Sequence, residues 1–124
     1  MRLLADTHAA LWLLDENQQL STHADELLTD PRNEVLLSAA VVWEVAIKRS
    51  LGKLDAPDGF AAKLLEGGAV PLAITIDHAR AVRLLPWHHR DPFDRLLVAQ
   101  ATLENAVLVS NDERLRPYGV QVAW

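Results

Sequence analysis

The sequence contains no cysteine, and this absence removes several kinds of chemistry at once. Disulfide scaffolds, thiol catalysis and thiolate metal sites are all excluded. The chain also lacks any uninterrupted apolar stretch near the roughly 20 residues that span a bilayer. An acidic residue, Asp6, follows the start of the chain too soon for a signal peptide. We therefore expect the protein to act in the cytoplasm, without a membrane partner.

Basic residues are few relative to acidic ones. Lys and Arg number 12 against 17 Asp and Glu, so the formal net charge is −5. A protein that coats nucleic acid is usually basic, and this balance argues against one. Half of the residues (50%) are apolar, which is enough for a core. The length predicts one compact domain over residues 1–124.

Apolar runs and turn-forming residues divide the chain into alternating strands and helices. We expect strands over residues 2–5, 34–37, 70–75, 107–109 and 120–124. Helices are expected over residues 7–14, 21–28, 39–51, 58–65, 77–85 and 92–104, with Ser21, Ser38 and Asp58 as N-caps. This alternation is typical of an α/β fold with a mostly parallel sheet covered on both faces.

Acidic side chains follow two of the predicted strands. Asp6 comes directly after the first strand, and Asp112 follows the fourth strand after Ser110 and Asn111. Ligands of such sheets bind beyond the carboxyl ends of the strands, so both acids are candidate site residues. Each also has a structural interpretation, as a helix N-cap for Asp6 and a turn or cap acid for Asp112. Ser110 can orient a neighbouring carboxylate or a metal-bound water.

A third acid lies inside an apolar helix. Glu44 has apolar neighbours on both sides in residues 39–47, which predicts a buried helix. A buried carboxylate needs a partner or a metal ion. One interpretation is an ion pair with Lys48, four residues later. The other is metal ligation, and the two are compatible because Lys48 can also face a phosphate.

Two further acids flank Pro92. Pro92 suits the first helical position and Asp91 the N-cap, so we interpret Asp91 as a cap. Asp94 falls in the first turn, where the helix dipole favours a carboxylate and where the side chain can also reach the crevice. The candidates for one shared site are therefore Asp6, Glu44, Asp94 and Asp112. An all-oxygen site selects a hard cation, Mg²⁺ or Mn²⁺, and without it the clustered carboxylates would have raised pKa values.

Several blocks of the sequence resemble the PIN-domain family, in particular its VapC-type ribonuclease toxins. The similar segments are residues 6–8, 38–48, 51–54, 89–100, 107–112 and 118–124. Together they span essentially the whole chain. The block over residues 89–100 is the most specific of them.

The resemblance implies a three-layer α/β/α PIN domain that cleaves RNA endonucleolytically with Mg²⁺. By position, Asp6 and Asp94 would be the principal Mg²⁺ ligands, and Glu44 and Asp112 would complete the acidic ring. A metal-activated water would attack phosphorus in line. The family also implies the toxin role in a type II toxin–antitoxin pair, a cognate antitoxin that blocks the acidic pocket, and often a homodimer.

The loop before the block over residues 89–100 holds further candidates for RNA contact. We interpret His88 and His89 as loop residues, which can touch an RNA phosphate beside Arg90 and Arg95. Trp87 is the best candidate for stacking on a base, because the other tryptophans lie in apolar elements and are expected in the core.

Two alternatives to a nuclease stay open at this point. One is a receiver-like signalling domain, which alternating strands and helices would suit. A receiver needs an acid pair after its first strand, an acid at a middle strand and a late lysine, and the sequence has none of these at the required places. The other is a PIN fold that binds RNA without cleaving it. The presence of all four acids argues against this second alternative.

Overall fold

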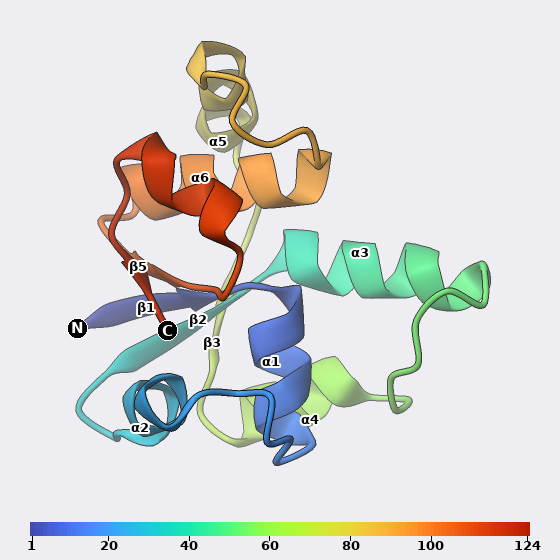
Figure 1. The fold of residues 1–124 in the computed structure, drawn as a ribbon. Helices are drawn as coiled ribbons and strands as arrows, with labels where there is room; N and C mark the ends of the chain where they lie inside the picture. Colours follow the sequence, from blue (N-terminus) through green and yellow to red (C-terminus); the bar gives the residue numbers. More distant parts are fainter.

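A five-stranded parallel sheet forms the centre of the protein in a computed structural model that describes residues 1–124 (Figure 1). The strands are β1 (Arg2–Ala5), β2 (Glu34–Ser38), β3 (Val70–Leu72), β4 (Val107–Val109) and β5 (Val122–Ala123). Their order is β3-β2-β1-β4-β5, and every pairing is parallel. The predicted α/β fold is thus confirmed. The receiver-like alternative is wrong, because receivers have the strand order 2-1-3-4-5.

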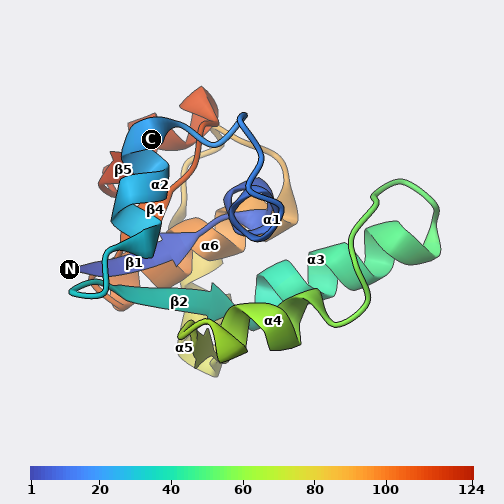
Figure 2. The ribbon, with the colours of Figure 1, turned by 90° about the horizontal axis from the view of Figure 1, so that it is seen from below.

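Helices cover both faces of the sheet (Figures 1 and 2). On one face lie α1 (Thr7–Leu14), α2 (Thr22–Thr29) and α4 (Phe60–Glu66). On the other lie α5 (Ile76–Ala81), η1 (Val82–Leu84), α6 (Pro92–Leu103) and η2 (Glu113–Tyr118). The helix α3 (Ala39–Ser50) continues from the end of β2 and projects beyond the sheet. No helix is both long enough and apolar enough to cross a membrane.

The central strand β1 shows why helices pack on both faces of the sheet. Leu3 and Leu4 are neighbours that point to opposite faces, and both are 0% exposed. Such two-sided burial is expected of a parallel sheet between helical layers. Because both faces of the sheet are covered, polar side chains are accommodated at the ends of the strands.

The N-cap of α4 differs from the prediction. Ser21 and Ser38 cap their helices as expected. Asp58 does not cap, because α4 begins one residue later, after Gly59 in the left-handed conformation at φ 71°. The Asp58 carboxylate instead accepts a hydrogen bond from Arg49 at 2.7 Å. The Arg49 partner and the turn at Gly59 together keep Asp58 outside the helix start.

Two predicted boundaries are also wrong beyond the usual uncertainty of one or two residues. The strand expected over residues 70–75 ends at Leu72, because Thr75 caps α5 in a capping box with His78. The helix expected over residues 77–85 ends at Ala81 and continues as the 3₁₀ turn η1. The last strand, expected over residues 120–124, covers Val122–Ala123, a difference that lies within this uncertainty.

Candidate metal centre

The carboxylate of Asp6 lies where β1 gives way to α1. It caps α1 by accepting a hydrogen bond from the backbone N–H of Ala9 at 2.8 Å. The residue is only 6% exposed. Burial raises the pKa of Asp6, while hydrogen bonds from Ser110 and Ala9 oppose that rise. The capping interpretation is confirmed, and the same carboxylate faces the cavity described below.

Glu44 is held between α1 and its own helix α3. The Thr7 hydroxyl donates a hydrogen bond to Glu44 Oε1 at 2.6 Å. The Lys48 ammonium group pairs with Glu44 Oε2, as the spacing of four residues predicts. This contact raises the pKa of Lys48, so the ammonium group stays charged. Both carboxylate oxygens of a buried acid therefore have donors, which fixes its orientation.

Asp91 and Asp94 stand at the start of α6. Asp91 Oδ1 accepts the backbone N–H groups of Phe93 at 2.8 Å and Asp94 at 3.1 Å, which confirms its role as the N-cap. Asp91 also lines the cavity, so its interpretation as a cap alone is too narrow. Burial, together with the negative charges of neighbouring acids, Asp91 first, raises the pKa of Asp94 to about 7.

Asp112 follows β4 and caps η2. Its Oδ1 accepts the backbone N–H of Arg114, and the Arg114 guanidinium lies 2.8 Å from Oδ2. This arginine contact is the main reason that the pKa of Asp112 falls to about 2. Ser110 is fully buried behind it and accepts the Asp112 backbone N–H at 3.1 Å. Ser110 thus connects the ends of β4 and β1 through Asp112 and Asp6.

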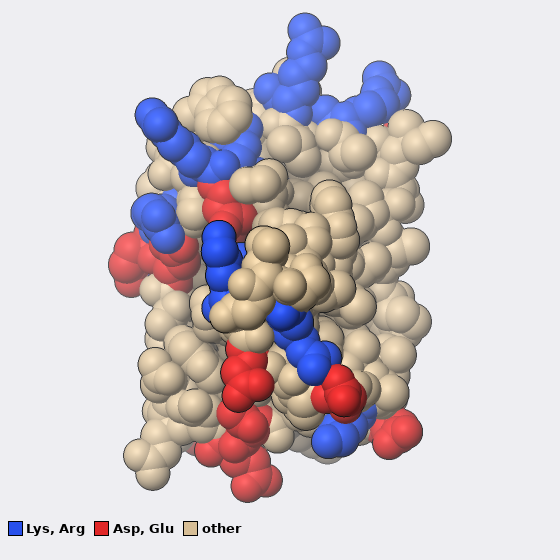
Figure 3. All heavy atoms as spheres, turned by 90° about the vertical axis from the view of Figure 1, so that its right-hand side faces the viewer, with Lys and Arg blue, Asp and Glu red and all other residues tan.

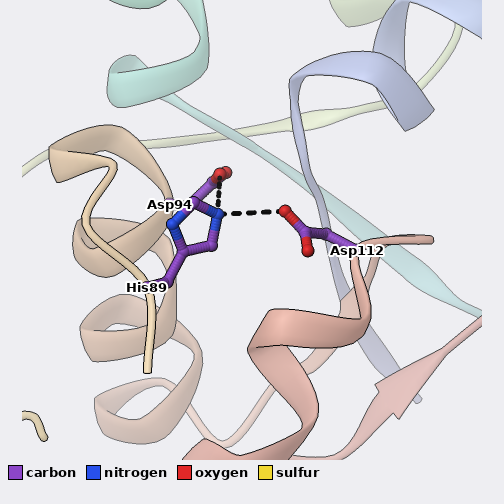
Figure 4. A group of neighbouring side chains, drawn as sticks. All are labelled: His89, Asp94 and Asp112. Atoms are coloured by element: carbon purple, nitrogen blue, oxygen red, sulfur yellow. Dashed lines mark hydrogen bonds and ion pairs between the residues drawn. The ribbon is translucent and has the colours of Figure 1, made fainter. Parts of the chain in front are cut away.

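His89 contacts two of the acids, whereas the sequence interpretation gave it only a contact with an RNA phosphate. Its Nε2 atom lies 3.0 Å from Asp94 Oδ2 and 2.9 Å from Asp112 Oδ2 (Figure 4). The residue is in the predicted loop but is only 5% exposed. The one local signal was its place two residues before the capping acid Asp91, whose backbone N–H it accepts. The path of the loop, which no short-range pattern fixes, brings it to the site.

One cavity of about 390 Å³ joins these groups at the carboxyl end of the sheet. Its lining residues are Asp6, Thr7, His8, Trp12, Glu44, Lys48, Asp91, Asp94, Asn111, Asp112 and Arg114. The four predicted acids therefore share one cavity with a fifth. His8, Trp12 and Arg114 were not predicted there, and Trp12 was expected in the core.

The donor set of this cavity suits a hard divalent cation. Carboxylate oxygens are the preferred ligands of Mg²⁺, and Asp94 and Asp112 come together at His89, with one side-chain atom of each of the three residues within 4.8 Å of the others. Burial first, and neighbouring acids second, raise the pKa values of Asp6 and Asp94, so a positive charge nearby would stabilise their ionised forms. A cation in the cavity would supply that charge, so the residues present fit the metal that the sequence predicts.

The other predicted contacts lie outside the cavity. Arg95 is 3% exposed, and its guanidinium donates to backbone oxygens including those of Pro86 and Leu85. It is therefore not available for the predicted RNA contact, since burial and these bonds hold it inside the loop. Trp87 is 75% exposed, with the Arg95 guanidinium 3.7 Å from the centre of its ring. Arg90 is exposed.

The fold and cavity define an α/β protein with an acidic, metal-compatible pocket at the carboxyl end of a parallel sheet. Residues 3–120 match the PIN domain family, and the chain belongs to this family. A segment of 57 residues is 42% identical to Ribonuclease VapC16 of Mycobacterium tuberculosis. That match covers 43% of this chain and 39% of the relative, so less than half of the relative is compared.

Solved structures with the same fold come from toxin–antitoxin complexes. The crystal structure of VapBC2 from Rickettsia felis, bound to a DNA fragment from its promoter, has a TM-score of 0.72 at 17% identity, covering 99% of this chain and 98% of that one. A toxin–antitoxin complex from Klebsiella pneumoniae has a TM-score of 0.65 at 17% identity, covering 98% and 96%. At this identity the likeness shows the fold.

Proposed function

We propose that the chain, as one PIN domain over residues 1–124, is a metal-dependent endoribonuclease and the toxin of a toxin–antitoxin pair. The observation that carries the proposal is the convergence of five carboxylates, from four separate segments, on one cavity. Membership of the PIN domain family supports it. So does the similarity of one segment to a protein named as a ribonuclease.

The proposed cofactor is Mg²⁺, with Mn²⁺ as a substitute. The residues that would hold it are Asp6, Glu44, Asp94 and Asp112. When bound, such an ion activates water and stabilises negative charge on a phosphoryl group. The protein contributes fixed acids, since Thr7 and Lys48 orient Glu44, and Ser110 ties Asp112 to Asp6.

Basic side chains near the cavity are the proposed phosphate contacts. Lys48 and Arg114 line it directly, and exposed Arg90 lies just before α6. On the face toward which α3 projects, Lys and Arg side chains lie above and below an acidic area (Figure 3). Phosphate contacts position RNA without reading its sequence. This arrangement lets a protein of net charge −5 bind RNA locally around an acidic centre.

Aromatic side chains supply proposed positions for unpaired bases. Trp12 and His8 line the cavity, and their ring centres lie 5.2 Å apart. Bases of single-stranded RNA stack on such rings, and stacking tolerates any base. Trp87 remains the second candidate, because its exposed ring extends from the loop before α6. The substrate proposed here is thus a single-stranded segment of RNA.

The proposed partner proteins are a cognate antitoxin and a second copy of the chain. Two of the similar structures are complexes of a toxin with its antitoxin. A basic segment of the antitoxin would suit the acidic cavity by charge. The proposed location is the cytoplasm, where an RNA substrate and an antitoxin would both be available.

The first test is RNA cleavage by purified Asp6→Asn and Asp94→Asn proteins with Mg²⁺ present. Each change removes a charge that the site needs, so cleavage is expected to fall about 100-fold or more. Asp77→Asn is the matched control, because Asp77 stands in the first turn of α5 and is exposed. Wild-type cleavage by both site variants would defeat the proposal. RNA binding without cleavage by the wild-type protein would favour the silent PIN alternative.

A further inference from the structure

His89 joins two of the proposed metal ligands from different segments. Its Nε2 atom is within hydrogen-bonding distance of Asp94 at the start of α6 and of Asp112 after β4. A buried imidazole in this place has two possible functions. It can be a further ligand through the Nε2 lone pair, or it can be a hydrogen-bond donor that holds the carboxylates.

The other ring nitrogen decides between these functions. His89 Nδ1 lies 3.1 Å from the backbone nitrogen of Asp91, which can only donate a hydrogen bond. Nδ1 must therefore be the acceptor and carry no proton. The ring proton then resides on Nε2, which donates a hydrogen bond to Asp112 Oδ2 and lies 3.0 Å from Asp94 Oδ2. To bind a metal ion through Nε2, His89 would need the opposite tautomer, with its proton on Nδ1. The Nδ1–H would then face the backbone N–H of Asp91, and two donors cannot form a hydrogen bond.

The backbone of His89 is fixed as firmly as its ring. Its N–H donates to the Tyr118 hydroxyl at 2.9 Å, and its carbonyl accepts from Arg95 Nη1 at 3.3 Å. Arg95 comes from α6 and Tyr118 from η2, the same two elements that carry Asp94 and Asp112. Buried Arg95 also holds the carbonyl of Pro86 at 2.8 Å. The loop that carries His89 is thus anchored to the two elements whose acids it joins.

We propose that His89 is a positioning residue that holds Asp112 through its Nε2–H, keeps Asp94 beside the same nitrogen atom, and so prepares the acidic site for its cation. Arg95 and Tyr118 set the loop that presents the ring. The inference rests on the proposed function, because the acids must hold a cation. A donor of this kind beside metal-ligating groups typically contributes 10–100-fold in metal affinity.

His78 is a matched control elsewhere in the same fold. It is 2% exposed, its Nδ1 accepts the backbone N–H of Thr75 at 3.0 Å, and its Nε2 lies 3.0 Å from Glu104. The bonding pattern is the one that His89 has, but the carboxylate that His78 contacts is Glu104, which is not one of the four site acids. Replacing His78 therefore reports the cost of losing a buried, bonded histidine, without a change at the acids.

The test is calorimetric titration of Mn²⁺ into the full-length wild type, His89→Ala, His89→Gln and His78→Ala, with thermal unfolding of each. His89→Ala is expected to bind Mn²⁺ about 10-fold more weakly or worse. His89→Gln restores an amide donor and is expected to recover most of that loss. His78→Ala is expected to melt at a lower temperature but to keep wild-type affinity. Wild-type affinity in His89→Ala would overturn the inference.

Two spectroscopic readouts separate positioning from ligation. Nitrogen NMR of the protein without metal is expected to show His89 with the proton on Nε2. Electron spin echo spectroscopy of the Mn²⁺-loaded protein is expected to show no nitrogen bound to the ion. A coordinated nitrogen that disappears in His89→Ala would overturn the positioning role but leave the proposed function intact. A wild type that binds no Mn²⁺ would defeat both.

Discussion

The two ends of α6 place acids in opposite surroundings. Asp94 at its start has a pKa raised to about 7, because it is buried among other acids. Glu104 after its end has a lowered pKa, because His78 and Arg2 donate to it. Arg2 also pairs with Glu34 at 3.1 Å. At the amino end of the sheet the acids thus have basic or hydrogen-bonding partners, whereas the carboxyl end has an excess of acid that a cation would neutralise.

The largest effect we predict is on RNA cleavage, which is expected to depend on the acid at the start of α6 but not on the acid after its end. Asp94→Asn is expected to reduce Mg²⁺-dependent RNA cleavage by about 100-fold or more. Glu104→Gln is expected to leave cleavage close to wild type and to lower the free energy of unfolding by about 1 kcal/mol, since it weakens a hydrogen-bonded pair. Cleavage assays and urea denaturation measure both. A comparable loss of cleavage in Glu104→Gln would remove the distinction.

The next effect concerns stability at the carboxyl end. Arg95→Leu is expected to lower the free energy of unfolding by roughly 3 kcal/mol, because several buried backbone oxygens lose their donor. Arg90→Leu is the matched control, since Arg90 is exposed and lies in the loop whose backbone Arg95 holds. Urea denaturation compares the two variants. Equal, small effects would show that Arg95 does not organise the loop.

A pH titration sharpens the comparison further. Since the pKa of Asp94 in the folded protein is about 7, against 3.8 for a free carboxyl, the folded state keeps a proton that the unfolded state releases between these values. Without metal, stability is therefore expected to fall as pH rises from about 4 to about 7. Asp94→Asn removes this charge, so it is expected to melt above wild type at pH 8.

Thermal unfolding in EDTA, at pH 5 and at pH 8, measures this effect. The difference between Asp94→Asn and wild type is expected to be small at pH 5, where Asp94 keeps its proton. Added Mg²⁺ is expected to raise the melting temperature of wild type at pH 8 but not that of the variant. A wild type whose melting temperature rises steadily from pH 5 to pH 8 without metal would contradict the assignment.

The smallest effect is predicted for a charge outside both regions. Asp58 pairs with Arg49 on the surface, and its side chain is 96% exposed. Exposed pairs contribute little because water screens them. Asp58→Asn is expected to leave the melting temperature and RNA cleavage unchanged. A clear loss of stability would show that the segment before α4 depends on this pair.

The sequence was informative where a local pattern marks a residue. Asp6 follows a strand, Glu44 lies in a buried helix and Asp94 stands in a helix first turn, so each had a signal within a few residues. Parallel topology then predicted that they meet. Local patterns also predicted the N-caps Ser21 and Ser38 correctly.

What the sequence could not predict depends on the path of loops. His89 reaches the acids because Arg95 and Tyr118 hold its loop, and these contacts span 6 and 29 residues. In the sequence, Arg95 follows an acid and looks like an exposed basic residue, but tertiary packing buries it. Asp58 is not the predicted N-cap, because the chain turns at Gly59 and the N-cap of α4 is that next residue.

The convergence of the acids on one cation is tested most directly by titrating Mn²⁺ into wild type and into single Asn or Gln variants of Asp6, Glu44, Asp94 and Asp112. We predict saturable binding to wild type and at least about 10-fold weaker binding to each variant, with Asp77→Asn unchanged. Wild-type affinity in all four variants would show that these carboxylates do not form one metal site.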